Sequence, residues 1–147
     1  MHYLPVYTIQ LVRESSHRTE NSREITRPAE AAEIIRELCG NSDREEAVIL
    51  LLNTRHSVSG VHRVSMGSLN ASIIHPRECF KAAILANAAS IILGHNHPSG
   101  ETNPSKEDQA ITARLVQAGE LLGIPLLDSL IVGPDWNHFS FKDKGLM

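Results

Sequence analysis

Two histidines and an aspartate stand close together in the sequence, in a pattern that can bind a metal ion. His95 and His97 are separated by one residue, and Asp108 follows eleven residues after His97. Side chains at i and i+2 of a strand point to the same side, and the intervening Pro and Gly residues allow the chain to fold back. Two imidazoles and one carboxylate are a common ligand set for catalytic zinc, which keeps a fourth position for water. The pattern predicts a Zn²⁺ site formed by His95, His97 and Asp108.

Each part of this pattern also has a purely structural interpretation. The chain contains eight histidines, so one closely spaced pair is unremarkable. Ser105 followed three residues later by Asp108 is typical of a helix N-terminus, where Ser caps the helix and an acid occupies the first turn. That capping role does not exclude metal binding. The conjunction of all these residues at the end of a buried strand favours the metal site.

Two short apolar runs, residues 47–52 and 88–93, predict the centre of the sheet that positions these ligands. Each is too short for a helix and is typical of a strand covered on both faces. Three helices are expected: one from Pro28 to just before Gly40, one that begins at Pro76, and one over residues 105–122. Further strands are expected at 57–67, 124–132 and 138–141. The order of these elements predicts an α/β fold, a helix–sheet–helix sandwich around a mixed sheet.

The N-terminal part of the chain differs in character from the rest. Residues 3–12 are rich in Tyr, Val and Ile and predict a strand, whereas residues 13–27 are polar and charged and predict an exposed loop. We therefore expect an N-terminal strand and polar loop over residues 1–27 and one zinc domain over residues 28–147.

The composition is that of a globular protein of about one domain. The 147 residues are 41% apolar, 21% charged and only 4% aromatic, so aliphatic side chains must form the core. Fourteen Lys and Arg residues against 17 Asp and Glu residues give a formal net charge of −3. Binding that coats nucleic acid by electrostatics alone needs many cationic contacts with phosphates. The charge argues against that class of protein.

Neither the cysteines nor the N-terminus indicates secretion. Cys39 and Cys79 cannot build a disulfide framework, and we interpret them as small buried hydrophobic residues. The N-terminus lacks the basic region and apolar stretch of a signal peptide, and no apolar run approaches the ~20 residues needed to cross a bilayer. We expect a cytoplasmic protein with no membrane partner.

The residues around the metal pattern resemble the signature of a known family. His95-x-His97, seven residues, Ser105, two residues and Asp108 resemble the JAMM (MPN+) zinc metallopeptidase signature. The stretches HNHPSG (95–100), PSKED (104–108) and HPRE (75–78) are similar to the bacterial RadC family in particular. The resemblance runs from about residue 40 to the C-terminus and implies a JAB/MPN-like fold with deaminase-like layering. Too few residues precede it for the helix-hairpin-helix segment common in RadC proteins, so we expect a stand-alone version of the domain.

The resemblance implies a role for each site residue. His95, His97 and Asp108 would bind Zn²⁺, and Ser105 would hydrogen-bond the oxygen of a tetrahedral intermediate. The family also uses a glutamate just before the first buried strand as general base. Glu45 is the matching residue and Glu46 its rival, because strand alternation lets only one of them face the metal; we predict Glu45.

The sequence departs from the family pattern at three positions. Asp128-Ser129 stands where the family often has Asp-His, Asn53 replaces a common Asp, and Ala47 replaces an aromatic residue. The ligand set is untouched, so these changes concern pocket shape and hydrogen bonding around the ligands. Asp128 is either a partner of a ligand histidine or a turn or surface residue.

Three functions are compatible with these residues. The resemblance implies a zinc-dependent hydrolase of peptide or isopeptide bonds, with a peptide or protein substrate. The alternative is a DNA-repair-associated or DNA-binding factor, as the family name suggests, although the charge does not support it. A non-catalytic binding module is disfavoured by the complete ligand set and the available glutamate.

Overall fold

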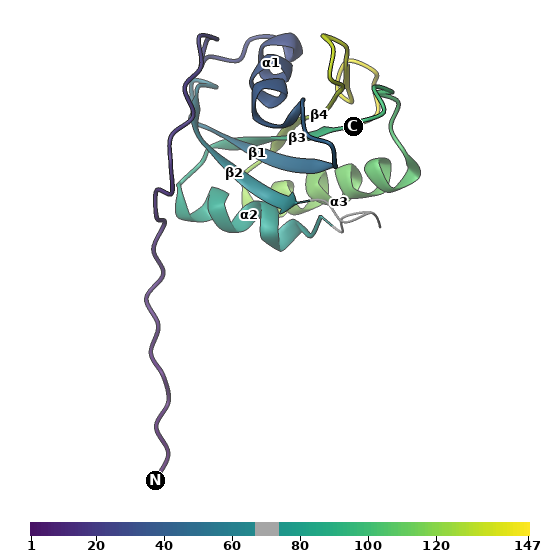
Figure 1. Ribbon diagram of the computed structural model, residues 1–147. Helices are drawn as coiled ribbons and strands as arrows, with labels where there is room; N and C mark the ends of the chain where they lie inside the picture. Colours follow the sequence, from purple (N-terminus) through teal and green to yellow (C-terminus); the bar gives the residue numbers. More distant parts are fainter. Residues whose placement is uncertain (67–73) are drawn as a thin grey trace.

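The computed structural model describes residues 1–66 and 74–147, and these form a three-layer α/β domain with an N-terminal extension (Figure 1). The elements follow in the order α1 (Pro28–Cys39), β1 (Glu46–Leu52), β2 (Val58–Met66), α2 (Pro76–Leu85), β3 (Ser90–Asn96), α3 (Lys106–Leu122), β4 (Leu126–Val132) and β5 (His138–Ser140). The predicted α/β class is confirmed.

The five strands form one mixed sheet in the order β2-β1-β3-β4-β5. The β3–β4 pair is parallel, and the other three pairs are antiparallel. Helix α1 covers one face, and α2 and α3 cover the other (Figure 1). All seven residues of β3 are buried. Strands buried on both faces read as continuous apolar runs, which is why the runs at 47–52 and 88–93 located the centre of the sheet.

Strand alternation sorts the core into two halves. In β1 and β3, the odd-numbered residues Ile49, Leu51, Ile91 and Leu93 pack toward α2 and α3, and the even-numbered Val48, Leu50 and Ile92 pack toward α1. Ala47 is paired with His95 across these strands. The alternation therefore sends His95 and His97 to the side of α3, the helix that carries Asp108.

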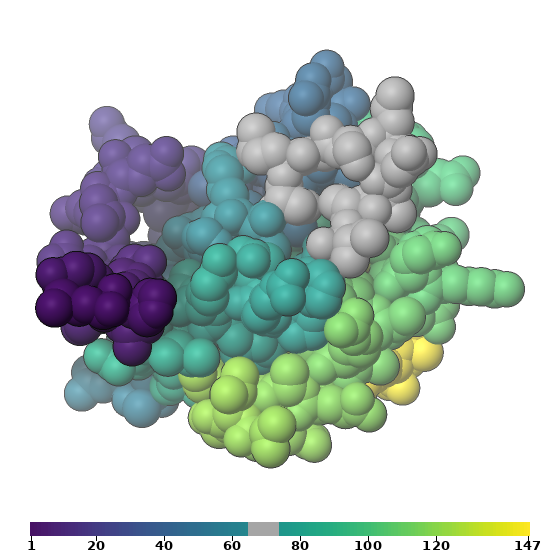
Figure 2. Space-filling view, turned by 90° about the horizontal axis from the view of Figure 1, so that it is seen from below, coloured from purple at the N-terminus to yellow at the C-terminus, as the bar shows by residue number. Residues whose placement is uncertain are grey.

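Helices α2 and α3 lie side by side on the lower face of the sheet (Figure 2). Phe80 and Ala83 of α2 and Leu115 of α3 are buried there, as their helical spacing predicts. Ile84 of α2 and Leu122 of α3 are 51% and 47% exposed. Both stand in the last turn of their helices.

The strand predicted for residues 3–12 is not formed. These residues run away from the domain, and their large apolar side chains are exposed (Figure 1). Chain contacts with the sheet begin only at Arg23, Glu24 and Ile25, which pair beside the start of β2. A strand needs a partner for its backbone groups and a surface for its side chains. High β-propensity alone does not supply either.

Cys39 and Cys79 are both buried, as predicted. Burial raises the pKa of each thiol to about 12, so neither is a thiolate near neutral pH. No helix in the described part of the chain is long and apolar enough to cross a membrane.

Candidate metal centre

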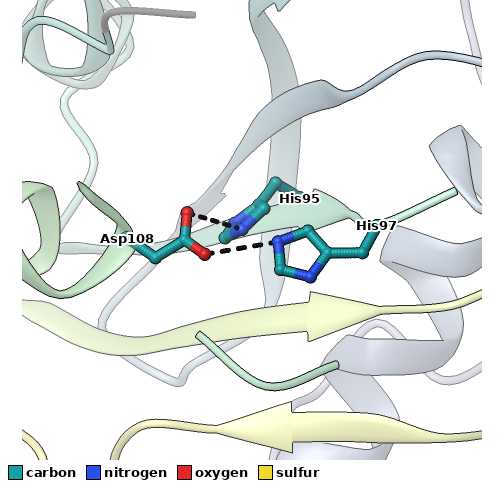
Figure 3. A group of neighbouring side chains, drawn as sticks. All are labelled: His95, His97 and Asp108. Atoms are coloured by element: carbon teal, nitrogen blue, oxygen red, sulfur yellow. Dashed lines mark ion pairs between the residues drawn. The ribbon is translucent and has the colours of Figure 1, made fainter. Parts of the chain in front are cut away.

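The fold brings His95, His97 and Asp108 together, as Figure 3 shows. Asp108 Oδ1 lies 3.2 Å from His95 Nε2, and Asp108 Oδ2 lies 3.2 Å from His97 Nε2. One potential ligand atom from each of the three residues lies within 4.8 Å of the others. Tetrahedral zinc with bonds of about 2.1 Å places its ligand atoms about 3.4 Å apart. The donor set and its spacing therefore fit a zinc ion.

The chain between the histidines and Asp108 is shaped by a turn. The His97 amide donates to Val132 O, and the Gly100 amide donates to His97 O at 2.9 Å in both cases. Gly100 has a φ of +88°, a conformation that glycine adopts without a steric penalty. This turn reverses the chain after β3 and brings the start of α3 back over the histidines.

His95 is the buried ligand, 5% exposed, and it provides the clearest sign of a missing partner. Neither ring nitrogen has a hydrogen-bond partner among the described residues, although Nε2 lies close to the Asp108 carboxylate. A buried polar atom without a partner costs roughly 1–3 kcal/mol. A metal ion bound at Nε2 would satisfy that atom.

His97 is oriented by the backbone that follows it. Its Nδ1 lies 2.7 Å from the carbonyl oxygen of Glu101, so Nδ1 carries the proton and Nε2 is left to coordinate. When Nε2 is protonated as well, it donates to Asp108 Oδ2, and this bond raises the pKa of His97 against the opposing effect of burial.

Asp108 serves the helix and the histidines at once. Its amide donates to Ser105 Oγ at 3.0 Å, and its Oδ2 accepts from the Ser105 amide at 2.8 Å, which completes a capping box. Burial opposes ionisation of Asp108, but the two imidazoles and the Ser105 amide hold the pKa of Asp108 well below its usual range. The carboxylate is therefore ionised and ready to bind a cation.

Glu45 and Glu46, at the start of β1, both line the cavity beside the ligands, but their carboxylates have different partners. Glu45 Oε1 lies 3.8 Å from His97 Nε2. The Glu46 carboxylate forms an ion pair with Arg63 at 3.2 Å. Because β1 pairs Ala47 with His95, the alternation of side chains places Glu45 on the metal side of the sheet. Glu45, rather than Glu46, therefore lies beside the candidate ligands.

The ligands open into a cavity of about 630 Å³. Glu45, His95, His97, Ser105 and Asp108 all line it. One wall is a stripe of α3 at i, i+3, i+4 and i+7 that consists of Glu107, Ala110, Ile111 and Arg114. Its volume lies within the range of about 300–1,000 Å³ that is typical of ligand pockets.

Asp128 does not support the ligand histidines. Its buried carboxylate accepts from the Ser129 amide at 2.7 Å, the Ser140 hydroxyl at 2.6 Å and the Lys142 amide at 3.1 Å. Burial raises the pKa of Asp128. These bonds tie β4 to β5 and the turn that follows. The prediction that Asp128 is a partner of a ligand histidine is therefore wrong, because its carboxylate is occupied by these three bonds.

Two parts of the site are not marked by the metal-binding pattern in the sequence. The Glu101 carbonyl that orients His97 belongs to the backbone, which residue types do not reveal. Asn96, between the two histidines, is fully buried and bonds to the peptide groups of Arg44 and Glu46. A buried amide must find partners for both its oxygen and its nitrogen, and this requirement could have drawn attention to Asn96.

Comparison with known proteins shows the family of this chain. The model of the RadC-like JAB domain family matches residues 25–146. The chain belongs to this family, which confirms the resemblance and extends it before residue 40. A UPF0758 protein of Rubrobacter xylanophilus is 46% identical over 123 residues, which are 84% of this chain and 53% of that protein.

Two further relatives show the same extent of similarity. A UPF0758 protein of Desulforamulus reducens is 48% identical over 130 residues, covering 82% of this chain and 57% of that protein. A UPF0758 protein of Clostridium acetobutylicum is 45% identical over 132 residues, covering 90% of this chain and 57% of that protein. The chain thus spans little more than half the length of these relatives.

Proposed function

We propose that this chain is a zinc-dependent hydrolase of peptide or isopeptide bonds. The observation that carries the proposal is the convergence of His95, His97 and Asp108, with both ring nitrogens of buried His95 lacking hydrogen-bond partners among the described residues. Membership of the JAB domain family supports a metal-dependent hydrolase. Two imidazoles and a carboxylate suit zinc better than Mg²⁺ or Ca²⁺, which prefer oxygen ligands.

The residues around the ligands have separate roles in the proposed hydrolysis of an amide bond. When bound, zinc supplies Lewis-acid activation of a water molecule and of the scissile carbonyl. The Glu45 carboxylate takes a proton from the water and later delivers it to the leaving amine. Its 47% exposed side chain stands at the cavity wall, within reach of both water and substrate.

Ser105 supplies a hydrogen bond to the developing oxyanion. Its Oγ accepts from the Asp108 amide, which leaves the hydroxyl proton free to donate. Ser105→Ala is expected to lower kcat by about 10²–10³-fold, as loss of an oxyanion donor does. Removal of the helix cap should also lower the free energy of unfolding by about 1 kcal/mol.

Steady-state kinetics and urea unfolding separate these two effects. Ser105→Thr keeps both the hydroxyl and the cap, and it is the matched control. If Ser105→Ala is destabilised but retains the full kcat, Ser105 is only a helix cap.

The charges of the cavity favour a peptide or protein over nucleic acid as the substrate. Its described lining carries four glutamates beside Asp108, and Arg114 is the one Lys or Arg among these residues; the glutamates are Glu45, Glu46, Glu101 and Glu107. Carboxylates repel a phosphate backbone, and a formal charge of −3 for the whole chain adds to this repulsion. Binding to DNA, the alternative function, would appear as a gel shift that weakens steeply with salt.

Metal removal and replacement test the proposed function. The zinc-loaded chain is incubated with a mixture of unstructured peptides and lysine-linked isopeptides, and new termini are identified by mass spectrometry. We expect cleavage that disappears after chelation and returns with one equivalent of zinc. Cleavage that persists in the fully chelated protein, or zinc-loaded protein that cleaves neither type of bond, would contradict the proposal.

A further inference from the structure

Asn96 lies between the two ligand histidines, and it binds the chain on both sides of Glu45. Its Oδ1 accepts from the Glu46 amide at 2.6 Å, and its Nδ2 donates to the Arg44 carbonyl at 3.0 Å. The residue is fully buried. One side-chain amide thus holds the peptide groups that immediately flank the proposed base.

These two bonds lie just beyond the point where the backbone pairing of β1 with β3 ends. The last backbone register between the strands joins Ala47 to His95. Beyond that pair, the Asn96 side chain bonds to the polar groups of Arg44 and Glu46. The Glu45 segment is therefore attached to the same strand that carries the ligands.

The Glu45 side chain has little else to fix its position. It is 47% exposed, and its single ion-pair contact within the described ranges is the 3.8 Å approach to His97 Nε2. No side-chain hydrogen bond to its carboxylate is found in residues 1–66 and 74–147. Its place beside the ligands must therefore be set by its backbone.

We infer that Asn96 is a positioning residue. It holds the Glu45 carboxylate beside His97, where the carboxylate can take a proton from the attacking water. The inference rests on the proposed hydrolase function. An amide suits this task because it accepts from an N–H and donates to a carbonyl from two different atoms. Aspartate at this position would keep the bond to the Glu46 amide but set a carboxylate against the Arg44 carbonyl.

Kinetics of the zinc-loaded chain test this role. Asn96→Ala is expected to lower kcat about 10²-fold, because small misplacements of catalytic groups have effects of this size. KM and zinc content should stay near the wild-type values, since the three ligands are kept and Asn96 itself does not line the cavity. Asn96→Asp should also lower kcat, and it replaces the alanine variant if that variant does not fold.

Asn53→Ala is the matched control. Asn53 stands at the opposite end of β1, and its side chain also makes two bonds to the backbone, both accepted by Oδ1 from the amides of Arg55 and Ser57. This variant should keep the wild-type kcat. In the Glu45→Gln background, Asn96→Ala should cause no further loss, because the two residues act in one step. An unchanged kcat in Asn96→Ala, or an equal loss in both backgrounds, would overturn the inference.

A readout without activity distinguishes failure of the inference from failure of the proposed function. We expect the Glu46 amide to exchange its hydrogen about tenfold faster in Asn96→Ala than in the wild type. A crystal structure of the zinc-loaded variant should show Glu45 moved away from His97. If the wild type cleaves nothing, these measurements still decide whether Asn96 places Glu45. Unchanged exchange together with an unmoved Glu45 would refute that role.

Discussion

Replacing both ligand histidines, His95→Ala together with His97→Ala, is expected to remove stoichiometric zinc binding and all hydrolysis. One zinc per chain should be present in the wild type and none in the variant, because Asp108 alone cannot retain the ion. Without zinc, the pKa of the attacking water returns from about 7 to 15.7. Elemental analysis and the peptide assay measure the two losses.

The zinc-free form should stay folded after this double replacement. The double replacement removes the contacts of the two rings with Asp108 and the His97 bond to the Glu101 carbonyl, but it leaves the buried apolar core and the capping box of α3 in place. The control is a second pair of histidines outside the cavity, His62→Ala with His138→Ala, which should keep both zinc and activity. Stoichiometric zinc in the His95/His97 variant would place the metal elsewhere.

Glu45→Gln is expected to keep its zinc and to lose about 10²–10⁴-fold in kcat. Glutamine preserves the size of the side chain but cannot take up a proton, and general acid–base catalysis contributes a factor of this order. The geometry gives the reason for choosing Glu45, which lies 3.8 Å from His97 Nε2. Zinc content and kcat measured on the same preparation separate loss of the base from loss of the metal.

Glu46→Gln is the matched control for this variant. The Glu46 carboxylate forms an ion pair with Arg63, so its neutralisation should leave kcat near the wild-type value. If Glu46→Gln abolishes hydrolysis while Glu45→Gln retains it, the base has been assigned to the wrong residue.

The centre of the fold could be predicted because burial on both faces leaves a continuous apolar run. The run at 88–93 located β3, but the strand continues through Gly94 and His95 to Asn96. Polar residues at a strand end give no hydrophobic signal even when they are buried. The helix starts at Pro28, Pro76 and Ser105 were predictable because capping and the conformational limits of proline are local properties.

The N-terminal arm shows where local preference fails. Residues 3–12 have the composition of a strand, yet the described structure gives them no strand to pair with. A sequence pattern reports what a segment favours, whereas strand formation depends on a partner elsewhere in the chain.

The candidate site also has one part that local sequence predicts and another that depends on distant contacts. The spacing of His95, His97 and Asp108 follows from a strand, a turn and a helix start that are adjacent in sequence. The choice between Glu45 and Glu46 depends on the register of β1 against β3, which alternation alone does not give. The bonds of Asn96 join residues about 50 positions apart, and no local pattern contains them.

The coordination of the zinc-loaded protein tests the central claim most directly. A crystal structure with anomalous scattering data at the zinc edge locates the ion and its ligands. We predict one zinc at about 2.0–2.2 Å from His95 Nε2, His97 Nε2 and an Asp108 oxygen, with a water molecule as the fourth ligand. A zinc ion bound elsewhere, or an Asp108 carboxylate that contacts only the Ser105 amide of its own helix, would contradict the account.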